Sequence, residues 1–197
     1  MPNLFKSPLF TIIKRDLLEY NGRIIICKGE YCGGDSQCQG VFYFDAKETP
    51  MIKVARGKTS QQEAFGVLIH EYSHFLQWRD QSKIWNEFDE NDFSFDSVIL
   101  KPKKNKDKIL LLIKLEADCE RRSIKIIRKN QILDDKMYAQ MANAVLYKYA
   151  YLYHYGVWPR GAKLKETYSL CPDKILKSYK DYLNIPEDIK ALYDSVI

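Results

Sequence analysis

The chain has 197 residues, of which 46% are hydrophobic and 29% charged, and its formal net charge is +5. This hydrophobic content excludes a disordered chain, and no apolar run approaches the ~20 residues that a membrane-spanning helix needs. The length suits one domain with a real core. We therefore expect a single domain over residues 1–197, with a core at about residues 20–130 and a helical extension at about 131–197.

Cysteine usage and the first residues indicate the compartment. Five cysteines are an odd number, which argues against a disulfide framework, and the start of the chain has no signal-peptide pattern. We expect a cytoplasmic protein with no membrane partner. Cys27, Cys32 and Cys38 surround a glycine-rich loop, but they lack the paired CxxC spacing of a structural zinc site, so we expect reduced thiols there.

Three short β-rich runs bounded by glycine come first in the chain, at residues 23–27, 40–45 and 51–55. They predict a small sheet. Pro50 argues against a central position for the third strand, because proline cannot donate to a ladder. An exposed edge of such a sheet could bind an extended peptide, and the alternative is that the strands only cover the helices.

A helix is predicted next. Ser60 and Glu63 form a capping-box pattern, which marks its start. The apolar residues that follow recur at helical spacing and form one stripe: Phe65, Leu68, Tyr72, Phe75 and Leu76.

The same helix carries the run His-Glu-Tyr-Ser-His at residues 70–74. Residues four apart share a helix face, so His70 and His74 can present two imidazole nitrogens to one metal ion. Glu71 lies about 100° around the helix, where it can reach a metal-bound water without taking a ligand position. Two nitrogen ligands, an open position for water and a carboxylate are what a zinc hydrolase needs. The alternative is two polar histidines on a solvated face.

A third ligand is expected in the helix predicted at residues 109–122. Glu116 and Glu120 are four apart and share a face. We expect Glu116 to bind the metal and Glu120 to orient a ligand histidine. The reverse assignment is the main rival, and another alternative is two solvated carboxylates that pair with arginines. The acidic stretch at residues 87–96, with Asp89, Glu90 and Asp92, is a third source without a clear helical period.

The flanking segments carry weaker signals. The basic run at residues 101–108 predicts an exposed loop that could contact nucleic acid, although no nucleic-acid motif accompanies it. A tyrosine-rich helix is predicted from Asp134 or Asp135 to about Gly156, and within it His154 and Tyr155 are candidate donors to an oxyanion. Two further short helices are expected to start at Pro172 and Pro186.

The run HEYSH, followed by a helix that contains Leu-Glu-Ala-Asp-Cys-Glu, resembles the zincin metallopeptidases and, among them, the gluzincins, whose third ligand is a glutamate. The spacing of Glu116 and Glu120 is similar to that of the ligand and its acidic supporting residue in thermolysin-like enzymes. The Glu-Ala-Asp run resembles the Glu-Ala-Asn run of ImmA/IrrE-type metallopeptidases. The resemblance covers about residues 40–128. It implies an α+β, zincin-like fold, in which a short mixed sheet packs on the active-site helix and on a glutamate-bearing helix, and in which a strand edge binds extended peptide.

The residues and the resemblance together predict a zinc-dependent metallopeptidase that acts on a peptide or protein. One Zn²⁺ per chain would be held by His70, His74 and Glu116, with Glu71 as general base. Two alternatives remain open: a DNA-associated or regulatory zincin protease, and a non-catalytic zinc-binding interaction module of a virus or mobile element.

Overall fold

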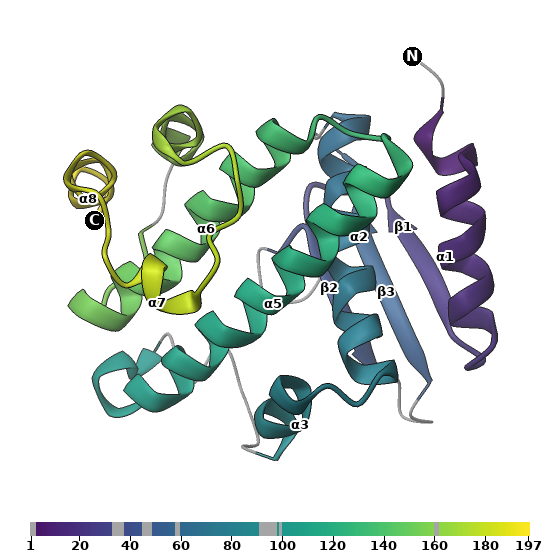
Figure 1. Cartoon of the computed structure of the whole chain (residues 1–197), viewed down its shortest axis with the longest axis horizontal. Coiled ribbons are helices and arrows are strands. Elements are labelled where there is room, and N and C mark those ends of the chain that lie inside the picture. The colour runs from purple at the N-terminus through teal and green to yellow at the C-terminus, as the bar shows by residue number, and fades with distance from the viewer. Residues whose placement is uncertain are drawn as a thin grey trace. The chain divides into compact units, whose positions relative to one another are not determined.

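The computed structural model describes residues 3–32, 38–44, 49–57, 60–90, 98, 100–159 and 162–197. These residues form an α+β structure with seven α-helices, three short 3-10 helices and three strands (Figure 1). By their contacts they divide into two compact units, Met1–Arg79 with Ile126–Leu133, and Asp80–Lys125 with Asp134–Ile197. The expectation of one domain stays a prediction. Among the described residues, none of the helices has the length and apolar character that crossing a membrane requires.

The sheet of the first unit has three strands, in the order β1 (Arg23–Cys27), β3 (Pro50–Ala55) and β2 (Gly40–Phe44). β1 runs parallel to β3, and β2 runs antiparallel to it. The three predicted strands are confirmed, but the argument against a central third strand was wrong. Pro50 is the first residue of β3, a position where strands tolerate a missing backbone donor.

Two helices of the first unit, α1 (Pro8–Leu18) and α2 (Gln61–Arg79), follow a short 3-10 helix, η1 (Leu4–Lys6), and pack beside the sheet (Figure 1). Phe42 and Phe44 of β2 pack edge-on or tilted against Phe75 and Trp78 of α2. Tyr20, just after α1, packs against the same two α2 rings. This aromatic cluster fixes which face of α2 is turned to the sheet.

The predicted capping box starts α2. The Ser60 backbone N–H donates to Glu63 Oε2 at 2.9 Å, and the Glu63 backbone N–H donates to Ser60 Oγ at 3.1 Å. These two bonds satisfy two of the donors that a helix start leaves unpaired. Four members of the predicted apolar stripe are buried, and the fifth, Leu76, is half-buried; the four are Phe65, Leu68, Tyr72 and Phe75.

The second unit is helical. Its elements are α3 (Lys83–Asp89), η2 (Pro102–Lys104), the part of α5 (Lys106–Asn130) up to Lys125, α6 (Asp135–Tyr155), η3 (Ala162–Leu170), α7 (Tyr179–Tyr182) and α8 (Glu187–Asp194). Helix α6 matches its prediction: Asp134 caps its start, and Gly156 ends it with a positive φ of 70°. Tyrosines fill much of the core, and their hydroxyls find partners, as when Tyr182 donates to Asn143 Oδ1 at 2.7 Å.

Two predictions of local structure in this unit were wrong. The basic run is only partly a loop, because residues 102–104 form η2 and α5 already begins at Lys106. No described helix starts at Pro172. Asn143 Nδ2 donates to the carbonyls of Pro172 and Lys174, at 2.8 and 2.9 Å, and holds this segment outside a helix. Pro186 does precede a helix, α8, as expected.

Gly40, the first residue of β2, lies against α2. A Cβ at this position would lie 2.3 Å from Val67 Cγ1 and 2.6 Å from Glu71 Oε1, closer than packed atoms approach. We expect Gly40→Ala to lower the free energy of unfolding by about 1–3 kcal/mol, the usual cost of overpacking, as measured by chemical denaturation. Gly29→Ala is the control, because the nearest atom there lies 3.3 Å away. An equal loss in both variants would show that Gly40 is not packed as described.

Candidate metal centre

Two histidines share one face of α2. The ring centroids of His70 and His74 lie 4.8 Å apart, with the ring planes at 87°. His74 is buried, at 8% exposed, and His70 is half-buried. The spacing of four residues therefore brings the two imidazoles together one helical turn apart, as the sequence predicts.

A glutamine that the sequence analysis missed fixes the orientation of the second histidine. Gln77 is fully buried, and its Oε1 lies 2.8 Å from His74 Nδ1. An amide oxygen only accepts, so Nδ1 carries the proton and Nε2 keeps a lone pair for a metal ion. Metal-binding histidines commonly donate their second ring N–H in this way. Gln77 comes three residues after His74, so the sequence alone puts it on the histidine face. A glutamine in a helix is usually an ordinary polar residue, however, and nothing else in the sequence marked it as the partner of His74.

Glu71 occupies a different side of α2, next to the start of β2. It is 7% exposed, and the short distances from the Gly40 position to Glu71 Oε1 and Cγ put its side chain against that strand. The Glu71 carboxylate therefore lies on the side of α2 that is turned to the sheet, and not on the face that carries the two histidines. This position suits a general base, which does not coordinate the metal.

Strand β2 is an edge strand among the described residues. The Ala55 backbone N–H donates to the Gln39 carbonyl at 2.7 Å, so the odd-numbered residues of this strand bond to β3. Gly40, Phe42 and Phe44 therefore direct their backbone N–H and C=O groups to the other edge. This edge starts at Gly40, beside Glu71.

Helix α5 carries the candidate third ligand and two neighbours. Glu116 is half-buried and Cys119 is fully buried, and their spacing of three residues places them side by side on the helix. Glu120 is 5% exposed, and the Tyr138 hydroxyl donates to its Oε2 at 2.7 Å. The buried Glu120 carboxylate also helps to raise the pKa of Tyr138, although desolvation is the larger cause.

Helices α2 and α5 each carry two side chains that offer a metal-ligand atom: His70 and His74 on α2, and Glu116 and Cys119 on α5. Imidazole nitrogen, carboxylate oxygen and cysteine sulfur are the three donor types of zinc sites, and four such donors are enough for a tetrahedral ion. The group could therefore hold a metal ion. The assignment of Glu116 as the third ligand, with Glu120 as its rival, stays a prediction. Cys119 was not predicted.

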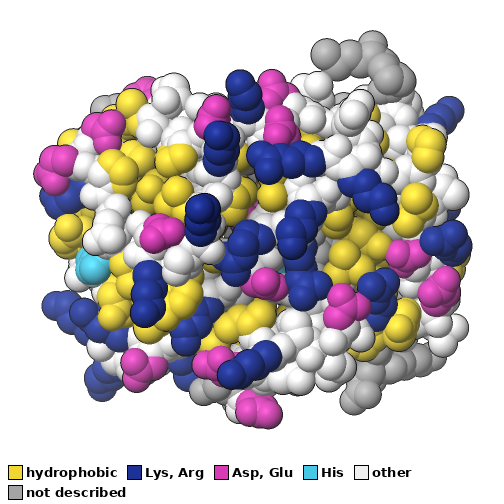
Figure 2. Space-filling view, viewed as in Figure 1, with side chains coloured by type: hydrophobic (Ala, Val, Ile, Leu, Met, Phe, Trp, Pro, Cys, Tyr) yellow, Lys and Arg dark blue, Asp and Glu magenta, His cyan; other side chains and the backbone are white. Residues whose placement is uncertain are grey.

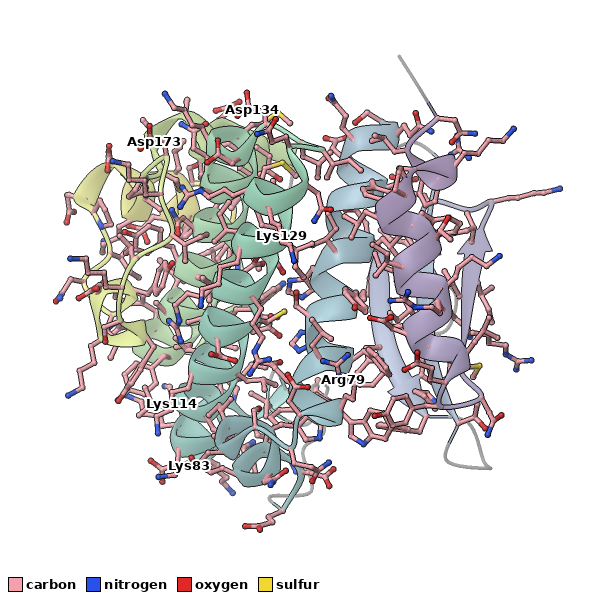
Figure 3. The ribbon with its side chains drawn as sticks, turned by 45° about the vertical axis from the view of Figure 1, so that its right-hand side comes forward. Arg79, Lys83, Lys114, Lys129, Asp134 and Asp173 are labelled. Carbon is pink, nitrogen blue, oxygen red and sulfur yellow. The ribbon has the colours of Figure 1, made fainter. Side chains whose placement is uncertain are left out.

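Other candidate positions are not part of this group in the described residues. In the acidic stretch, Glu87 lies 3.8 Å from Lys114, which is labelled in Figure 3, and Asp92 lies outside the described residues. Cys27, Cys32 and Cys38 are thiols, and burial raises the pKa of Cys32 to about 12.

The two candidate oxyanion donors at the end of α6 have other contacts. His154 Nε2 lies 2.8 Å from the Leu183 carbonyl oxygen. The Tyr155 ring packs against Tyr151, with centroids 4.5 Å apart, and Lys190 lies over it. Both side chains are exposed, and their role at an oxyanion stays a prediction.

Comparisons with models of known protein families, with curated proteins and with solved structures gave no match.

We expect Gln77→Met to weaken metal affinity by about 10–100-fold, because methionine fills a similar volume but cannot accept the His74 Nδ1 proton. A zinc titration against a chromophoric chelator measures this affinity. Gln62→Met, on the first turns of α2, is the matched control and should leave the affinity unchanged. Unchanged affinity in Gln77→Met would show that this contact does not orient the ligand.

We expect Glu116→Gln to weaken zinc affinity more than Glu120→Gln does. A ligand contributes directly to binding, whereas a supporting residue typically costs about 10–100-fold. Glutamine at position 120 still offers the Tyr138 hydroxyl an acceptor, so the fold should survive. The reverse order in the same chelator titration would move the ligand assignment to Glu120, and two negligible effects would exclude α5 from the site.

Proposed function

We propose that this protein is a zinc-dependent metallopeptidase. The observation that carries the proposal is the histidine pair of α2, whose rings lie 4.8 Å apart on one face of the helix, with the buried Glu71 on the same helix. Two histidines and a glutamate are a ligand set found in catalytic zinc sites. The resemblance of HEYSH to the gluzincin motif supports the same assignment.

The metal would be held by His70, His74 and Glu116, with Gln77 orienting His74. When bound, zinc supplies a bound water of lowered pKa and polarises the scissile carbonyl. The identity of the ion as Zn²⁺, at one per chain, is part of the proposal, and the mixed nitrogen and oxygen donors suit it.

Glu71 would act as the general base. It takes the proton that the attacking water releases and then delivers it to the leaving amine, a role that contributes about 10²–10⁴-fold. The packing of its side chain against Gly40 holds the carboxylate in place before substrate arrives. A preorganised base avoids a reorganisation cost during the reaction.

The edge of β2 that is turned away from β3 would bind the substrate as an added strand. Gly40 and Phe42 direct backbone donors and acceptors to that edge, and main-chain bonding of this kind holds an extended peptide whatever its sequence. This edge starts beside Glu71. A substrate that pairs with the edge would therefore have one of its peptide bonds close to Glu71, the general base. The substrate is thus an extended or locally unfolded segment of a peptide or protein.

One specific observation favours a second function, a non-catalytic zinc-binding module. Cys119 is a fourth candidate ligand, and zinc sites with four protein ligands are usually structural. A DNA-associated protease is the weaker alternative. Lys101, Lys103 and Lys104 are exposed, and acidic side chains lie among the basic ones on the face seen in Figure 2. Salt-dependent DNA binding would favour it.

We expect Glu71→Gln to keep the fold and the zinc but to abolish peptide hydrolysis, because the amide cannot accept the water's proton. The measurement is cleavage of a diverse peptide library, read by mass spectrometry, beside elemental analysis of zinc. Glu19→Gln, on an exposed carboxylate after α1, is the matched control. Zinc loss in Glu71→Gln would make Glu71 a ligand. A wild-type protein that binds zinc but cleaves no peptide would favour the non-catalytic module.

A further inference from the structure

Three cysteines lie close together in the first unit, between the end of β1 and the start of β2. Cys27 is the last residue of β1, Cys32 comes five residues later, and Cys38 comes shortly before β2 begins. The Cys32 backbone N–H donates to the Cys38 carbonyl at 3.0 Å. The Cys27 and Cys32 thiols form a hydrogen bond with each other, and Cys27 Sγ lies 4.0 Å from the Cys32 carbonyl oxygen. Cys27 and Cys32 are therefore a pair of thiols in direct contact.

Backbone hydrogen bonds hold the turn that joins these two thiols. The Arg56 N–H donates to the Cys27 carbonyl at 2.9 Å, and the Gly57 N–H donates to the Gly29 carbonyl at 2.8 Å. The turn is thus tied to the residues that follow β3. Because the separation along the chain is short and the backbone is already held, joining the Cys27 and Cys32 sulfurs would cost little conformational entropy.

The two thiols differ in their access to solvent. Cys32 is 7% exposed, and burial raises its pKa to about 12, with a further contribution from the thiols of Cys27 and Cys38. The thiolate is the reactive form of cysteine, so Cys32 is not the first to react with an oxidant at neutral pH. Cys27 is half-buried, so a small oxidant reaches its sulfur more readily. Oxidation of the pair would therefore begin at Cys27.

We propose that Cys27 and Cys32 form a reversible disulfide, so that the turn after β1 is a redox modification site. Hydrogen peroxide is the oxidant. The Cys27 sulfur attacks one peroxide oxygen, the O–O bond breaks, and a sulfenic acid and water form. The Cys32 sulfur then attacks the Cys27 sulfur, the S–S bond forms, and the hydroxyl leaves with the Cys32 proton as a second water. A dithiol reductant returns both thiols, the state that the structure shows.

The disulfide would also affect the start of β2, through Gln39. Cys32 Sγ donates to the Gln39 carbonyl at 3.2 Å, and oxidation removes this bond because a disulfide sulfur has no proton to donate. The next residue, Gly40, packs against the Glu71 side chain. This coupling rests on the proposed function, in which Glu71 is the general base and the β2 edge binds the substrate. We expect the oxidised chain to cleave peptides more slowly.

The primary test maps the disulfides of the full chain after treatment with hydrogen peroxide. Remaining thiols are blocked with iodoacetamide in denaturant, and the chain is digested with trypsin and examined by mass spectrometry. Trypsin cuts after Lys28, so a disulfide from Cys27 to Cys32 joins two peptides, whereas a Cys32–Cys38 disulfide stays within one.

We expect the joined peptides in the wild type and in Cys38→Ser, and their loss in Cys27→Ser or on adding dithiothreitol. Cys171, which is 4% exposed in a core cluster of the second unit, is the internal control and should be recovered as a thiol. Recovery of both Cys27 and Cys32 as thiols would overturn the inference, and so would a Cys32–Cys38 disulfide in the wild type.

A second measurement separates this inference from the proposed function. Oxidation should slow cleavage of a peptide library by the wild type about 2–10-fold, the range that one lost hydrogen bond covers, and dithiothreitol should restore the rate. Cys38→Ser should respond in the same way, and Cys27→Ser should not respond. A mapped disulfide with no cleavage in either state supports the modification site and overturns the peptidase. Unchanged cleavage by a chain that carries the disulfide overturns the coupling through Gln39.

Discussion

The periodicity of the α-helix is the constraint on which the rest of this structure depends. With 3.6 residues per turn, one helix presents separate stripes to separate neighbours. In α2, one stripe, which includes Phe75 and Trp78, packs on the aromatic side chains of β2. Another carries His70 and His74, and Glu71 is turned toward Gly40. The packing of the first stripe thus fixes the direction of the other two, so that core residues with no polar chemistry determine where the ligands point.

Buried polar groups impose the second constraint, because each must find a partner when it leaves water. His74 finds Gln77, and Glu120 finds the Tyr138 hydroxyl. These partners serve the fold and the site together. The hydrogen bond from His74 Nδ1 to Gln77 gives this buried ring nitrogen its partner, and it leaves the lone pair of Nε2 available to a metal ion. The cost of desolvation therefore selects the tautomer that metal binding requires.

Local signals were sufficient to predict the parts of the site that lie within one helix. The reciprocal bonds of Ser60 and Glu63, and the spacing of the histidines, act over at most four residues, so the sequence alone contains them. Strand order is different, because it depends on pairing between segments far apart in the chain. The rule that excludes proline from central strands failed for Pro50, since it takes no account of a strand's first position. Asn143 overrode the local preference at Pro172 through contacts across 29 and 31 residues.

Cys119 escaped prediction for a related reason. A cysteine in an apolar helical pattern is usually a small core residue, and only its neighbours in space show whether it has another role. The zincin motif predicts three protein ligands and a water, and Cys119 is a further donor on the helix that carries Glu116. The motif acts over one turn of α2, so it carries no information about a thiol on another helix, and for this reason the sequence analysis passed over Cys119.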